Sequence, residues 1–161
     1  MKNTQVAGKN ETAENAPQMT KTGDRRVFDL EERLLEFSAV IIDVSEALPN
    51  SRAGNHVAGQ LLRCGTSPYS NHGEAESAES PADFIHKMKV CLKELRETRR
   101  WSRLINRKRW LEGSKDLQFV LREVEELIRI FAASIRTAER NRLKNRPTTL
   151  GSSSRRSRNE S

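Results

Sequence analysis

Four segments of the sequence carry apolar residues at alternating intervals of three and four positions, a spacing that places side chains along one face of an α-helix. The first segment ends before Pro49, and its apolar stripe consists of Leu30, Leu34, Phe37, Ile41, Val44 and Leu48. The second segment covers about residues 53–79, the third begins at Ser80 and the fourth begins at Ser114. Because the connections are short, the pattern predicts an all-α fold, an antiparallel up-down-up-down four-helix bundle.

Residues at the starts of three segments have the chemistry of helix caps. Asp29 is followed three positions later by Glu32, the spacing of a capping box. Ser80 precedes Pro81, and proline is well suited to the first helical position. Ser114 stands in the same relation to the last segment, so these three helices have well-defined predicted starts.

The second segment contains a proline, and the sequence leaves two interpretations of it open. The apolar and small residues keep their helical spacing through Pro68, which predicts one long helix bent at Gly65–Pro68 because proline removes a backbone hydrogen bond. The alternative is two short helices, with Ser67 capping the second and Pro68 in its first position.

Composition separates the bundle from both ends of the chain. Residues 1–26 and 145–161 are polar and have no periodic apolar face, so we expect a disordered N-terminal tail and a disordered, basic C-terminal tail. The bundle is expected to occupy residues 27–144 as one domain. Since only 35% of the chain is hydrophobic and 32% is charged, its core must be thin.

Charge and cysteine content restrict the class of protein. The formal net charge is +7, which favours anionic partners such as nucleic acid. No apolar run is long enough to span a bilayer, and no secretory signal precedes the bundle, so we expect no membrane association. Cys64 and Cys91 form no CxxC pair, and we interpret them as reduced thiols of a cytoplasmic protein.

The middle of the chain resembles a known family. The matching residues are Gln60-Leu61-Leu62-Arg63, Gly65-Thr66-Ser67, Asn71, Glu74-Ala75, Phe84-Ile85-His86-Lys87-Met88 and Lys93-Glu94-Leu95-Arg96-Glu97-Thr98. This pattern is similar to the four-helix-bundle proteins encoded in intervening sequences of bacterial large-subunit rRNA, and to the accessory variability determinant of diversity-generating retroelements. The resemblance implies a left-handed bundle that assembles into a homo-oligomeric ring, commonly a pentamer, with a basic surface. It also implies nucleic acid and a reverse transcriptase as partners.

Several residues around the proline have side chains that occur in catalytic or metal sites. They are Cys64, His72, Glu74, Glu76, His86 and Cys91. Their spacing matches no zinc signature, and a tight bundle offers no cleft for a Cys-His nucleophile. We therefore expect no catalytic residue, no metal and no cofactor. Arg63, Pro68, Asn71 and Glu74 are interpreted as structural or interface residues, with the two polar side chains specifying one packing.

Positive charge is concentrated on one row of the third helix. Consecutive members of the row stand four or three residues apart, and over about 27 Å every position is basic. The row comprises Lys89, Lys93, Arg96, Arg100, Arg103 and Arg107. Because neighbouring like charges repel, such a row indicates an anionic partner. With no base-reading motif in the sequence, we expect RNA or DNA to be bound through backbone phosphates.

An alternative function is self-assembly without nucleic acid. The first helix is acidic, so its carboxylates are candidates to pair with the cations of the third helix, within one subunit or across a ring. Six apolar residues also lie off the four stripes and would be exposed on a single bundle: Leu35, Ile42, Leu62, Trp101, Leu104 and Ile130. Exposed apolar area of this kind usually marks an interface, which favours a homo-oligomer.

Overall fold

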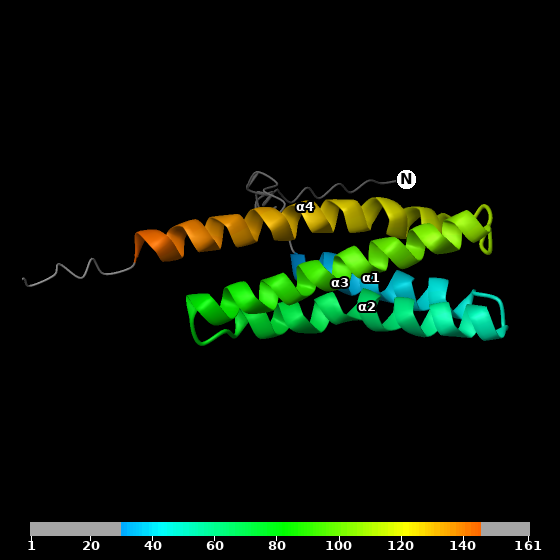
Figure 1. The fold of residues 1–161 in the computed structure, drawn as a ribbon, viewed down its shortest axis with the longest axis horizontal. Coiled ribbons are helices and arrows are strands. Elements are labelled where there is room, and N and C mark those ends of the chain that lie inside the picture. The colour runs from blue at the N-terminus through cyan, green and yellow to red at the C-terminus, as the bar shows by residue number, and fades with distance from the viewer. Residues whose placement is uncertain (1–29, 146–161) are drawn as a thin grey trace, which may run out of the picture.

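A computed structural model describes residues 30–145 and contains four helices within that range: α1 (Leu30–Glu46), α2 (Arg52–Glu76), α3 (Pro81–Lys108) and α4 (Lys115–Lys144). Consecutive helices run in opposite directions (Figure 1). The predicted all-α four-helix bundle is confirmed, and no strand occurs in residues 30–145. The expectations for Asp29 and for the two tails lie outside the described residues, apart from Asn145, which follows α4.

The predicted apolar stripes form the core. The largest side chains without solvent exposure include Phe37 of α1, Leu61 of α2, Leu95 of α3 and Phe131 of α4. Thr98 and Ser102 also lie in the core of α3. Their hydroxyls donate hydrogen bonds of 2.9 Å to the carbonyls four residues earlier, which satisfies these buried polar groups within the helix.

The second helix is continuous through Pro68, so the alternative of two short helices is wrong. The side chain of Ser51 caps its start by accepting from the Gly54 amide at 3.1 Å. Near the proline, the Asn71 amide group donates to both the carbonyl and the hydroxyl oxygen of Ser67, each at 2.9 Å. These bonds join neighbouring turns of α2 beside the proline, whose own missing backbone bond is the one to the Cys64 carbonyl. The predicted bend angle at Gly65–Pro68 stays a prediction.

The starts of α3 and α4 agree with the predicted caps. Ser80 accepts from the Asp83 amide and Ser114 from the Leu117 amide, both at 3.1 Å. Between the two helices, Arg109 and Gly113 have positive φ angles of 55° and 78°. Glycine adopts this left-handed conformation at little cost, and so the chain reverses direction here within a short connection.

Each helix packs against two neighbours, and α1 and α3 occupy opposite corners of the bundle. Within residues 30–145, α2 contacts α1 and α3, while α4 packs extensively on α3 and only thinly on α1. The expectation that acidic α1 pairs with basic α3 inside one subunit is therefore wrong. Since α1 has 17 residues and α4 has 30, α4 extends well beyond the start of α1 (Figure 1).

Candidate nucleic-acid interface

The basic row of α3 faces solvent along its whole length. Positions such as Met88, Cys91 and Leu95 turn inward to the core, and the row occupies the outer side of the same helix. All six of its members are exposed: Lys89, Lys93, Arg96, Arg100, Arg103 and Arg107. The heptad phase of α3 alone therefore accounts for the placement of the row.

The six cations differ in how far the chain neutralises them. Lys89 forms a 2.6 Å ion pair with Glu139 of α4, and Lys93 lies 3.8 Å from Glu94. The four arginines of the row make no ion pair with any residue in the range 30–145: Arg96, Arg100, Arg103 and Arg107. The uncompensated charge is thus concentrated in the C-terminal two thirds of the row.

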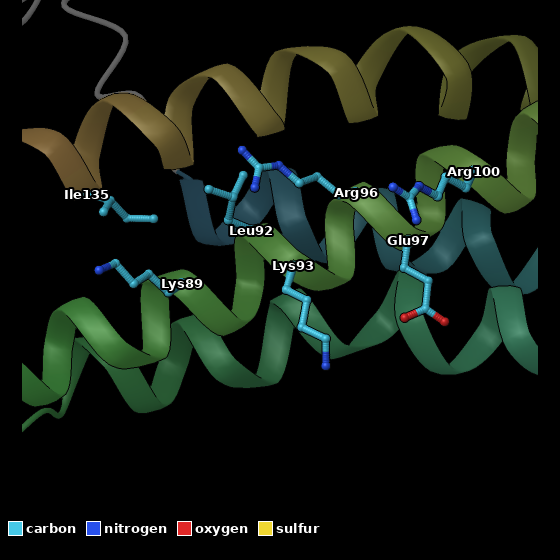
Figure 2. Close-up of a pocket in the computed structure, with 7 residues that line it drawn as sticks. All are labelled: Lys89, Leu92, Lys93, Arg96, Glu97, Arg100 and Ile135. Atoms are coloured by element: carbon cyan, nitrogen blue, oxygen red, sulfur yellow. The ribbon is translucent and has the colours of Figure 1, made fainter.

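A groove of about 540 Å³ runs beside the row, between α3 and α4. Arg96 extends toward α4 and the side chain of Arg100 runs along α3 in the direction of Arg96, whereas Lys93 and Glu97 point toward the α2 side (Figure 2). The residues that line it are Lys89, Leu92, Lys93, Arg96, Glu97, Arg100 and Ile135. A second hollow of about 590 Å³ continues along α3 past Arg103 and Arg107. The arginines therefore border recessed surface that a chain of phosphates can follow.

The residues assigned a structural or interface role lie where α2 meets α3. Arg63 reaches across to two carboxylates of α3, Glu94 at 3.3 Å and Glu97. Glu74 forms an ion pair with Lys87, and this bond raises the pKa of Lys87. Asn71 bonds back within α2, as described above.

Pro68 is buried at the same contact. Its carbonyl oxygen accepts from the Cys91 thiol at 3.6 Å. Pro68 and two of the charged residues, Arg63 and Glu74, thus join α2 to α3 within one subunit.

The side chains with catalytic or metal-binding chemistry are dispersed or buried. Burial raises the pKa of the Cys64 thiol to about 11 and that of Cys91 to about 12, which keeps both protonated and unreactive near neutral pH. His72 is buried and contacts the edge of Phe131. Within residues 30–145 no group of three or more His, Cys, Asp or Glu side chains is arranged to hold a metal ion.

The structure reveals a second basic row, which was not predicted from the sequence. It lies on the outer face of α4, where exposed cations recur every seven residues: Lys115, Arg122, Arg129 and Arg136. Arg129 pairs with Glu126 of the same helix. The seven-residue spacing is visible in the sequence and, once the core stripe of α4 is aligned, places these residues opposite the core.

An acidic face with exposed apolar residues lies on α1. Leu35 and Ile42 are 44% and 47% exposed, and the exposed Ala39 lies between them along the helix. The carboxylates beside this stripe are also exposed: Glu31, Glu32, Glu36, Asp43 and Glu46. The exposure expected for Leu35, Ile42, Leu62 and Leu104 is confirmed.

The prediction that Trp101 and Ile130 are exposed is wrong, because both are partly buried. Trp101 packs edge-on against His56 of α2, and its indole N–H donates to Glu97. Neighbouring side chains cover these two residues, and sequence spacing does not indicate such cover.

None of the helices within residues 30–145 combines the length and apolar character needed to cross a membrane. Comparison with curated proteins finds no match. The crystal structure of a protein of unknown function from the S23 ribosomal protein family of Bacteroides thetaiotaomicron is similar, with 31% sequence identity and a TM-score of 0.60. The match covers 65% of this chain and 96% of that one. The model of the 23S rRNA-intervening sequence protein family matches residues 28–133, more than half of the chain, and the protein therefore belongs to this family.

Proposed function

We propose that the protein is a non-enzymatic nucleic-acid-binding protein that contacts backbone phosphates through the basic row of α3. The observation that carries this proposal is the set of four exposed arginines without a carboxylate partner in residues 30–145. Arginine binds phosphate with paired N–H donors and keeps its charge at any physiological pH. A row of such residues suits a polyanion better than a single small anion.

The form of the row also indicates how selective the binding is. Its arginines stand on the outer face of α3, and the sequence contains no base-reading motif beside them. Contacts to phosphate position a nucleic acid without reading its bases. We expect similar affinities for different base sequences, with RNA and DNA both as candidate ligands.

Family membership supplies a biological setting for this activity. The family is named for proteins of intervening sequences in 23S rRNA. We infer a cytoplasmic protein that accompanies such a sequence and binds nucleic acid there. A reverse transcriptase as partner follows only from the resemblance to the retroelement protein, and it stays a prediction.

Self-assembly is the second part of the proposal, and a different observation favours it. Leu35, Ala39 and Ile42 form a continuous exposed apolar stripe on α1, and contiguous exposed apolar surface is a feature of protein interfaces. We infer that a second copy of the chain covers this stripe in a homo-oligomer, with a pentameric ring as the form implied by the family resemblance. If no nucleic acid binds, the alternative is a self-assembling scaffold.

A salt titration tests the nucleic-acid proposal. Anisotropy of labelled RNA and DNA oligonucleotides is measured at several salt concentrations, and light scattering gives the mass of the free protein. Four engaged arginines predict a log–log slope of roughly −3 to −4 per subunit, from about −0.7 to −0.9 per phosphate. Tight binding that does not depend on salt contradicts the proposal, and so does an absence of binding at low salt.

A further inference from the structure

At the contact between α3 and α4, two acidic residues of α4 lie fourteen positions apart on one side of the helix, with an alanine midway between them. Glu125 and Glu139 stand seven residues either side of Ala132, so all three positions share one side of α4. Glu125 lies 3.3 Å from Arg99, and Glu139 lies 2.6 Å from Lys89. Between these two ion pairs, the residue on the same side of α4 is Ala132, which has a methyl group in place of a carboxylate.

The groove between α3 and α4 has a charged rim and an apolar floor. Arg96 extends toward α4 and Arg100 runs along α3 in the direction of Arg96 (Figure 2); both line the groove, and neither forms an ion pair within residues 30–145. Leu92 and Ile135 line its floor and are almost fully buried. Its volume of about 540 Å³ falls in the range of small-molecule pockets, and it is larger than a phosphate group alone requires.

We propose that this groove holds one nucleotide of a single strand, with the phosphate between Arg96 and Arg100 and the sugar and base against Leu92 and Ile135. The inference rests on the nucleic-acid binding proposed above and specifies the ligand as single-stranded. A guanidinium plane stacks on an unpaired base, and apolar side chains cover the rest of its face. In a duplex both faces of each base are already stacked, so the floor of the groove would stay empty.

Adding a carboxylate at Ala132 tests the site with a matched control. Ala132→Glu places an acid between the Glu125–Arg99 and Glu139–Lys89 ion pairs, level with the part of α3 that contains Arg96, whereas Ala133→Glu places the same charge on the neighbouring, exposed position. With a labelled single-stranded oligothymidylate, we expect Ala132→Glu to weaken binding roughly tenfold and Ala133→Glu to change it little. Circular dichroism and melting identify any loss of fold. Arg96→Gln, which removes the cation without adding an acid, is the second variant, with an expected loss of similar size.

Two further probes distinguish the outcomes. An abasic oligonucleotide of equal length keeps every phosphate but lacks bases, and we expect it to bind roughly fivefold more weakly. A duplex of the same length should also bind more weakly per phosphate. If no oligonucleotide binds, the proposed function itself fails. Oligonucleotides could instead bind with the same affinity to Ala132→Glu and Ala133→Glu, or the abasic strand or the duplex could match the affinity per phosphate of the single strand. Either result would rule out the nucleotide site and leave phosphate binding in place.

Discussion

The outer faces of α1 and α3 lie at opposite corners of the bundle and carry opposite charge. On α1, five exposed carboxylates flank an apolar stripe, and the only cation of the helix, Arg33, forms an ion pair with Glu123 at 2.6 Å. On α3, four exposed arginines have no acidic partner in residues 30–145. Because α1 and α3 do not pack directly against each other and no ion pair joins them, neither face neutralises the other within residues 30–145. Within residues 30–145 the four arginines have no acidic partner, and we propose a polyanion as their ligand and a second copy of the chain as the cover for the apolar stripe on α1.

Reversing the charge of α3 is the strongest way to test this contrast. Changing Arg96, Arg100 and Arg103 to Glu removes three phosphate contacts and adds repulsion, so we expect nucleic-acid affinity to fall about a hundredfold or more at low salt. The matched control applies the same charge change to Lys115, Arg122 and Arg136 on the outer row of α4, with a smaller expected loss. Anisotropy measures binding, and light scattering measures mass.

None of the three arginines of α3 contributes to the core, so helix content and oligomer mass should not change. A variant that binds nucleic acid normally but dissociates into monomers would overturn the assignment. Such a result would show that the basic row of α3 contacts another subunit, for example by pairing with the acidic α1 of the next copy.

Changing the apolar stripe of α1 tests the other side of the comparison. We expect Leu35→Gln combined with Ile42→Gln to shift the protein from an oligomer to its 18.4 kDa monomer at micromolar concentration. Each side chain buried in an interface contributes about 1.5–3 kcal/mol, and glutamine alters no charge. Light scattering reports the mass, and Leu62→Gln on α2 is the control. A wild-type protein that is already monomeric would refute self-assembly.

The sequence predicts the interior of the bundle well because helical spacing alone determines it. The stripe from Leu34 to Val44 is buried as expected, and Ser80 and Ser114 cap helices where local chemistry indicated. The opposite corners of α1 and α3 also follow from the predicted up-down-up-down topology, in which the first and third helices lie on a diagonal. The expected pairing of their charges within one subunit conflicted with that topology.

The interactions of the basic row were less predictable, because they depend on the register of one helix against another. Spacing on α3 identified Lys89 as a member of the row, but its pairing with Glu139 requires the alignment of α4 along α3. The same alignment places Ala132 between the Glu125–Arg99 and Glu139–Lys89 ion pairs. Register comes from packing of the whole core, so it could not be derived from the pattern of either helix alone.

Two glycines of α2 differ in their surroundings: Gly65 packs against α1, whereas Gly59 lies at the open surface. A Cβ added at Gly65 would lie 2.6 Å from a side-chain carbon of Ile41, whereas one at Gly59 would meet nothing within 4 Å. We expect Gly65→Ala to lower the free energy of unfolding by about 1–3 kcal/mol through overpacking. Gly59→Ala should raise it by up to about 1 kcal/mol, because alanine favours helix. Urea unfolding measures both, and equal effects would contradict the close packing of α1 on α2.

The two thiols on the inner side of the α2–α3 contact give the smallest predicted effect. Burial raises the pKa of Cys64 to about 11 and of Cys91 to about 12, from an ordinary value of 9.0. Above pH 9 the unfolded chain therefore loses these protons before the folded chain does, and the folded state is penalised. The stability linked to protonated thiols is complete below pH 9 and is lost as the pH rises toward 12.

Urea unfolding under reducing conditions at pH 8.5 and 9.5 measures this loss, and we expect roughly 1 kcal/mol for both thiols together. The control is Cys64→Ala combined with Cys91→Ala, which should be less stable at pH 8.5 because it leaves cavities, but should lose less stability over the same interval. Equal losses in the two proteins would show that other groups cause the alkaline destabilisation. In that case, the thiols would not be held protonated by the packing of α2 on α3.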